Sequence, residues 1–68
     1  MDSGTTGERY ARIFRKAGVY LARGNVARAL EVLKEGRELA EREGHPKMAR
    51  LFAGEIERAG TLPDSEKK

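Results

Sequence analysis

The chain has 68 residues and a formal net charge of +3, from 14 basic and 11 acidic residues, and it contains no cysteine. This length allows one domain with a small core, and the lack of cysteine excludes a disulfide framework, thiolate metal ligands and a thiol nucleophile. No stretch reaches the roughly 20 apolar residues that span a bilayer, and residues 1–7 lack the features of a signal peptide. We therefore expect a cytoplasmic protein without membrane insertion that depends on packing, or on a partner, for its stability.

The first predicted helix covers residues 8–23 and follows a flexible N-terminal segment at residues 1–7. At about 100° per residue, one arc of roughly 120° contains its apolar side chains. These are Tyr10, Ile13, Phe14, Ala17, Tyr20 and Leu21, and a basic stripe of Arg9, Arg12, Lys16 and Arg23 lies beside them. Gly24 predicts a left-handed helix stop and Asn25 a cap for the next helix, so a tight turn should join two antiparallel helices.

The second predicted helix covers residues 26–43, and its apolar arc spans nearly half of its circumference. The arc consists of Val26, Ala29, Leu30, Leu33, Gly36 and Ala40, widened by Val32 and Leu39. Because one neighbouring helix covers less than this, the second helix should lie between two others or leave part of the arc for a ligand.

The third predicted helix covers residues 46–59, after a break at Gly44, and Pro46 suits its first turn. Its apolar side chains are Met48, Ala49, Phe52, Ile56 and Ala59. We predict an all-α fold, a three-helix antiparallel bundle over residues 8–62, followed by a disordered tail at residues 63–68. Basic residues dominate the first helix and acidic ones the second, which favours weak ion pairs between them, each worth about 0–1 kcal/mol.

Several positions of the first two helices follow the spacing of a known helical hairpin. Ala17 and Tyr20 match a small residue and an aromatic residue, Gly24 a turn glycine, Ala29 a small residue and Leu33 a large apolar one, and Gly36 replaces an alanine. Residues 10–43 therefore resemble one tetratricopeptide repeat, a hairpin of about 34 residues. Ile13, Lys16 and Glu41 depart from the tryptophan, leucine and proline of that family. The resemblance implies a peptide-binding scaffold, in which the third helix starts a following repeat or acts as a cap.

The turn from Gly24 to Leu30 is also similar to the hairpin turn of a second family. Its run of glycine, small polar residue, three variable residues, alanine and leucine looks like that of the microtubule-interacting and trafficking domain. This resemblance implies a three-helix bundle that holds an acidic, apolar tail segment of a membrane-remodelling protein in a groove between helices. We keep it as the second choice.

The sequence offers no convincing set of catalytic, metal-binding or cofactor-binding residues. His45 stands alone in a glycine-proline turn, and Ser3 and Ser65 lie in the expected flexible ends, where no base positions them. The glutamates of residues 31–43 fall on the solvent side of their helix, and no glycine-lysine-serine or glycine-lysine-threonine sequence marks a phosphate loop. We expect no enzyme activity and no cofactor.

The pattern favours an adaptor that docks a peptide or helix of a partner protein, one that is acidic and partly apolar. We predict two alternative surfaces, either of which could instead form a homodimer. The first is the inner face of helix one, with Ala11, Phe14, Arg15, Gly18, Leu21 and Ala22, and the second is an uncovered edge with Val32, Leu39 and Leu51. The alternative function is nucleic-acid binding by the basic stripe, which the tight turn after the first helix makes less favourable.

Overall fold

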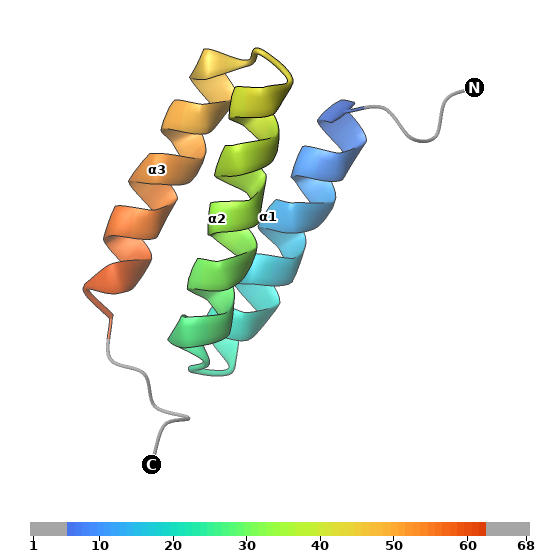
Figure 1. Cartoon of the computed structure of the whole chain (residues 1–68). Helices are drawn as coiled ribbons and strands as arrows, with labels where there is room; N and C mark the ends of the chain where they lie inside the picture. Colours follow the sequence, from blue (N-terminus) through green and yellow to red (C-terminus); the bar gives the residue numbers. More distant parts are fainter. Residues whose placement is uncertain (1–5, 63–68) are drawn as a thin grey trace.

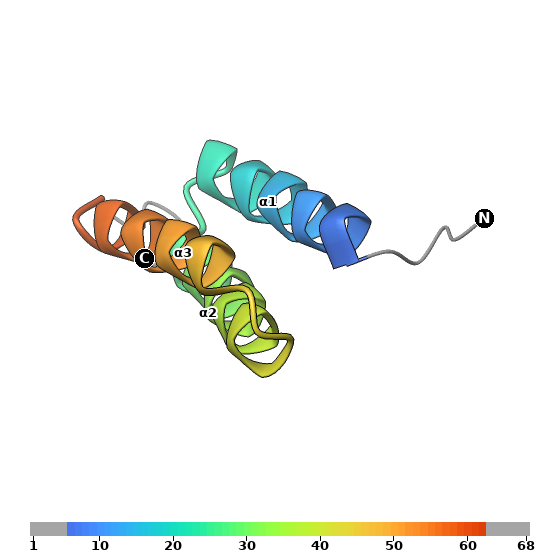
Figure 2. The same cartoon turned by 90° about the horizontal axis from the view of Figure 1, so that it is seen from above.

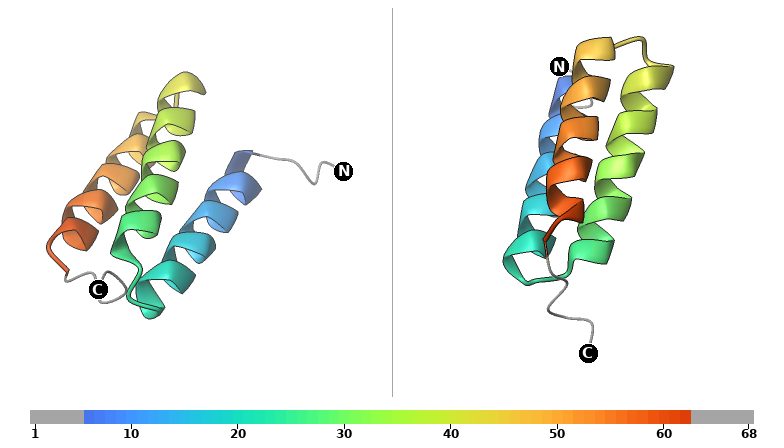
Figure 3. Two further views of the ribbon diagram at one scale, coloured as in Figure 1. Left: turned by 60° about the horizontal axis from the view of Figure 1, so that its bottom comes forward. Right: turned by 90° about the vertical axis from the view of Figure 1, so that its left-hand side faces the viewer.

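The structure, a computed structural model, describes residues 6–62, which form three α-helices joined by short turns (Figure 1). Helix α1 spans Thr6–Ala22, α2 spans Val26–Arg42 and α3 spans Pro46–Gly60. Successive helices reverse direction, so that α1 and α3 run the same way, as the views in Figure 3 also show. The predicted all-α bundle of three helices is confirmed for this part of the chain.

The helix boundaries lie close to the predicted ones, with one correction at the start of α1. Thr6 and Gly7, which we expected in the flexible N-terminal segment, form the first turn of α1. Glu8 stands in that turn, where a carboxylate stabilises the positive end of the helix dipole. Residues 1–5 and 63–68, for which a flexible segment and a disordered tail were predicted, lie outside the described residues.

Both turns are closed by the same backbone motif, built on a glycine with positive φ. Gly24 has φ +80°, and the N–H of Asn25 donates to the carbonyl of Tyr20 at 2.9 Å. Gly44 has φ +76°, and the N–H of His45 donates to the carbonyl of Ala40 at 2.8 Å. This six-to-one bond defines a Schellman motif, which only glycine enters without steric cost. The glycines therefore fix both reversals of the chain, as the sequence predicted.

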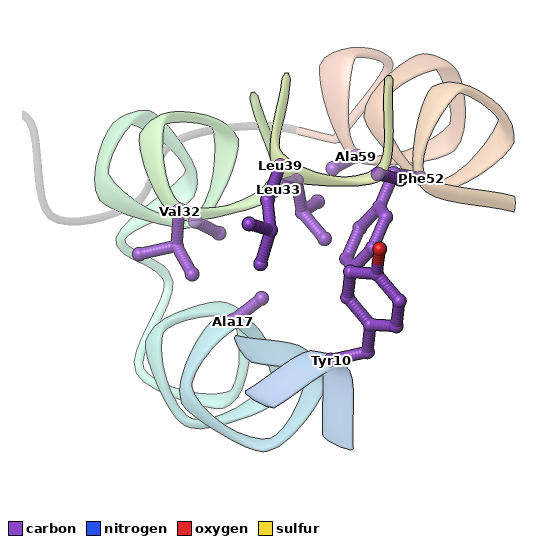
Figure 4. Packing of buried hydrophobic residues seen from close by; sticks show 9 residues of the cluster. Tyr10, Ala17, Val32, Leu33, Leu39, Phe52 and Ala59 are labelled. Carbon is purple, nitrogen blue, oxygen red and sulfur yellow. The ribbon is translucent and has the colours of Figure 1, made fainter. Parts of the chain in front are cut away.

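Helix α2 lies at the centre of the packing and contacts both neighbours. The three helices stand at the corners of a triangle rather than in one layer (Figures 2 and 4). The predicted arc of α2 is buried almost completely, with Leu33 at 1% exposure and only Leu30 left half-buried. The width of this arc is explained by its two partners, since α1 covers one part and α3 the other.

Phe52 of α3 is the side chain that joins all three helices. It has no exposed surface, and it points between the helices toward Tyr10 of α1 (Figure 4). Its ring stacks on that of Phe14, with centroids 4.4 Å apart and planes 6° from parallel, and it meets the ring of Tyr10 edge-on at 5.7 Å. From α2, Gly36 leaves room for the same ring, because a Cβ atom there would lie 2.5 Å from Phe52 Cε1. The aromatic cluster thus depends on a glycine opposite it.

Candidate functional site

The predicted inner face of α1 is accessible in the folded bundle. Ala11, Arg15, Gly18 and Ala22 are exposed, and Phe14 and Leu21 are half-buried at its edge. No atom outside the local helix lies within 4 Å of a Cβ built on Gly18, so this glycine faces open space. The six residues, which we call the inner face of α1, combine small exposed positions with two apolar side chains and one cation.

Two large apolar side chains are exposed in and just after α3. Leu51 is 54% exposed and Leu62, just after α3, is 48% exposed. Leu51 precedes Phe52 and Ala53 follows it, so these two neighbours project on opposite sides of Phe52, about 100° away on each side. Since Ala53 borders a hollow on the α2 side, Leu51 belongs to the side nearer α1. Sequence reasoning had grouped Leu51 with Val32 and Leu39, but Leu51 is exposed and borders a shallow hollow with Lys47 and Arg50 of its own helix.

The second predicted surface, an uncovered edge with Val32 and Leu39, is wrong. Both side chains are only 8% exposed and belong to the core cluster that contains Ala17 of α1. The wide arc of α2 left two possibilities open from the sequence, burial between two helices or an edge free for a ligand. Because α1 packs on the side of α2 that carries Val32 and Leu39, the first possibility holds.

Three residues of the predicted basic stripe surround one apolar side chain. Arg9, Arg12 and Lys16 line a hollow of about 190 Å³ together with the half-buried Ile13. Arg23 is exposed but lies beyond the end of α1, in the turn to α2, and does not line this hollow. The stripe is therefore a compact cationic cluster with an apolar floor rather than a line of four cations.

The predicted ion pairs between basic α1 and acidic α2 do not form at the hollow between these two helices. Arg9 and Arg42 line this hollow of about 310 Å³ together with Glu35 and Glu38. None of these four forms an ion pair among the residues that the structure describes. An ion pair forms within α3 instead, between Arg58 and Glu55. Because none of these charges comes within ion-pair distance of another, they contribute a screened attraction and not fixed contacts.

His45 takes part in a contact that sequence reasoning missed. Its exposed ring lies at the start of α3, where it makes no side-chain cap, and its Nδ1 is 2.9 Å from the hydroxyl of Tyr10. The pKa of Tyr10 is raised above its ordinary value, mainly by burial and also by the nearby Glu43 carboxylate, while Arg9 acts in the opposite direction. The two partners stand 35 residues apart, so no local pattern could have indicated the bond.

A third hollow, between α2 and α3, also has no counterpart among the predicted sites. It is lined by two arginines, Arg37 and Arg50, and by the alanines Ala49 and Ala53. Arg37 is half-buried and lies at the border of the buried arc of α2. Its position beside that apolar arc is the one sequence signal that could have singled it out. Among the described residues, no group of three or more histidine, cysteine, aspartate or glutamate side chains is arranged to hold a metal ion.

Comparisons with known proteins give no relative from which a function could be transferred. No family model, no curated protein and no solved structure matches the chain. Within residues 6–62, no helix combines the length and the apolar character needed to cross a membrane. The surfaces described above are therefore the basis on which a function is proposed.

Proposed function

We propose that this chain is a protein-docking module that binds a peptide or helix of a partner protein on the inner face of α1. The observation that carries the proposal is the open space at Gly18 in the middle of that face. A glycine inside a helix costs about 0.5–1 kcal/mol relative to alanine. No packing contact in the bundle requires this glycine, whereas a partner backbone lying across α1 would.

The chemistry of the partner follows from the side chains around Gly18. Phe14 and Leu21 offer apolar contacts, and Arg15 offers a cation on the face itself. The cationic cluster of Arg9, Arg12 and Lys16 lies on another side of the same helix. A partner segment that is acidic and partly apolar complements this combination of surfaces.

The arrangement of the helices supports the same proposal. In a tetratricopeptide-like array, the first helices of successive hairpins run in the same direction and offer a shared face to a peptide. Helices α1 and α3 run in the same direction on either side of the space filled by Phe52 and Tyr10 (Figures 1 and 4). We therefore include in the proposal that α1 and α2 form a repeat-like hairpin and that α3 stands in the place of the next helix.

The test is peptide selection from a displayed random library with the wild-type chain and three variants. Gly18→Phe and Ala11→Phe place a large ring on the inner face of α1, and Ala27→Phe places the same ring on an exposed alanine of α2. We expect acidic, leucine-containing peptides to bind the wild type and Ala27→Phe, and to bind the two α1 variants at least about tenfold more weakly. If the α1 variants, folded by circular dichroism, bind the selected peptides as well as wild type, the proposed site is wrong.

A second copy of the chain is the other protein partner that this face could accept. Sedimentation over a range of concentrations distinguishes the two cases. A dimer that Gly18→Phe converts to a monomer would show that the inner face of α1 is a self-association surface. A monomer at all concentrations leaves the face free for a different protein.

Nucleic-acid binding is the second candidate, and the cluster of Arg9, Arg12 and Lys16 is the observation that favours it. For binding through phosphates, the logarithm of the affinity falls with the logarithm of salt concentration by about 0.9 per phosphate neutralised. Arg12→Gln should then reduce this slope by about 1. If the chain binds neither duplex nor single-stranded probes at low salt, this candidate is excluded.

A further inference from the structure

The hollow between α2 and α3 combines charged side chains with small apolar ones and is separate from the surfaces of α1. Its volume is about 530 Å³, and all of its lining residues come from α2, α3 and the turn between them. Ala49 and Ala53 form a small apolar wall on α3, so the hollow is left open where longer side chains would fill it. A ligand there would not touch α1.

Two unpaired arginines supply the positive charge of this hollow. Arg37 comes from α2 and Arg50 from α3, and neither forms an ion pair or a side-chain hydrogen bond among the described residues. The Nε–H group of Arg37 is buried and has no hydrogen-bond partner. A buried donor without a partner raises the free energy of the fold, and the guanidinium group favours any acceptor that can pair with it.

We propose that this hollow binds a carboxylate side chain of a partner protein, held between the guanidinium groups of Arg37 and Arg50. A carboxylate accepts two parallel hydrogen bonds from one guanidinium group, and rotation of the Arg37 side chain would present its Nε–H and an Nη–H together. The second arginine adds a further charge-assisted contact from the facing helix. The unpaired Nε–H thereby gains the acceptor it lacks.

The charge of the lining favours a singly charged ligand. Glu41 is the acidic residue of the hollow, so the two arginines and this glutamate leave a net charge of +1 with His45 neutral. An aspartate or glutamate side chain matches this charge, whereas a doubly charged phosphate exceeds it and would be repelled more strongly by Glu41. This reasoning commits the site to the carboxylate of an acidic protein segment.

The binding test uses nuclear magnetic resonance, because the Arg37 Nε–H group gives its own signal. The probe is a blocked hexapeptide of alternating glutamate and alanine, and its control replaces each glutamate with glutamine. We expect the glutamate peptide to shift the Arg37 Nε–H signal saturably and the glutamine peptide to leave it unchanged. An unshifted signal, or an equal shift with inorganic phosphate at the same concentration, would overturn the proposal.

Four variants separate this site from the inner face and the cationic cluster of α1. Because Arg37→Gln removes the reporting side-chain signal, binding to that variant is followed through the backbone amide signals of Ala49 and Ala53. Arg37→Gln and Arg50→Gln should each weaken binding of the glutamate peptide roughly tenfold. Ala53→Leu keeps both arginines but fills the hollow, and it should weaken binding to a similar extent. Arg12→Gln removes the same charge from α1 and should leave the shift at Arg37 and its saturation unchanged. Wild-type affinity of Arg37→Gln for the glutamate peptide, or an equal loss of affinity in Arg12→Gln, would contradict binding in the hollow. This result does not depend on whether Gly18→Phe affects the inner face of α1.

Discussion

Replacing Gly36 with alanine tests whether the aromatic cluster fixes the distance between α2 and α3. The added Cβ atom would lie 2.5 Å from Cε1, 2.6 Å from Cζ and 2.8 Å from Cδ1 of Phe52. These distances are well below the 3.5–4.0 Å or so at which carbon atoms attract each other. The Phe52 ring cannot turn aside freely, because it is stacked on the ring of Phe14 and also packs edge-on against the ring of Tyr10.

The expected magnitude is the balance of two opposing effects. Alanine improves helix propensity over glycine by about 0.5–1 kcal/mol. Overpacking a filled core costs typically about 1–3 kcal/mol. Because three ring atoms of a fully buried side chain are affected, we place the clash near the upper end of this range and expect a net loss of about 1–2 kcal/mol. In a domain of this size that loss lowers the melting temperature by roughly 4–16 °C.

Urea unfolding followed by circular dichroism gives the free energy directly, and Gly18→Ala provides the matched control. The same methyl group is added inside a helix, but at Gly18 it meets open space, so this variant should gain about 0.5–1 kcal/mol. The two alanine variants should therefore differ by about 1.5–3 kcal/mol. Phe52→Leu should relieve part of the cost of Gly36→Ala in a double-mutant cycle. A Gly36→Ala variant as stable as wild type would refute the reasoning.

Substitutions at three further positions probe the first turn and the buried tyrosine. Asn25→Ala removes the side-chain acceptor that caps α2 and should cost about 1 kcal/mol in urea unfolding, whereas Asn25→Asp should retain most of the stability. Gly24→Ala forces a side chain into φ +80° and should cost about 1–2 kcal/mol; an unchanged midpoint would contradict this. Burial, and secondarily Glu43, raises the pKa of Tyr10 despite Arg9, so the folded pKa exceeds the unfolded one. Stability should then be unaffected below about pH 10 and fall above it, and Tyr10→Phe should show less of this alkaline loss in urea unfolding at about pH 8 and pH 11.

The fold could be predicted because the local signals agree with one another. Two glycines, each followed by a cap position, divide the chain into three amphipathic segments, and short turns leave only antiparallel neighbours. The width of the apolar arc of α2 was also informative, since it exceeded what one neighbouring helix covers and so indicated a second one. The structure bears this out, with α2 packed against both α1 and α3.

The surfaces were harder to predict, because exposure depends on which flank of a helix its neighbour covers. Val32 and Leu39 lie on one edge of the α2 arc and Arg37 on the other, and the sequence does not say which edge α1 occupies. Once α1 covers Leu39, that predicted binding edge disappears, and the hollow at Arg37 is left open. The bond between Tyr10 and His45 was equally hidden, because it depends on how far α1 extends beside the turn before α3.

The central glycines of α1 and α2 differ in what fills the space beside them. Gly36 weakens its helix, but Phe52 fills the space that it leaves, so the bundle recovers the loss through packing. Gly18 weakens its helix by a similar amount, and no side chain of the bundle fills the space beside it. An alanine at position 18 would make the isolated domain more stable. Packing therefore explains Gly36 but not Gly18, and Gly54 of α3 faces open space in the same way. Under the proposed function, a partner lying against α1 uses the small size and the exposure of Gly18.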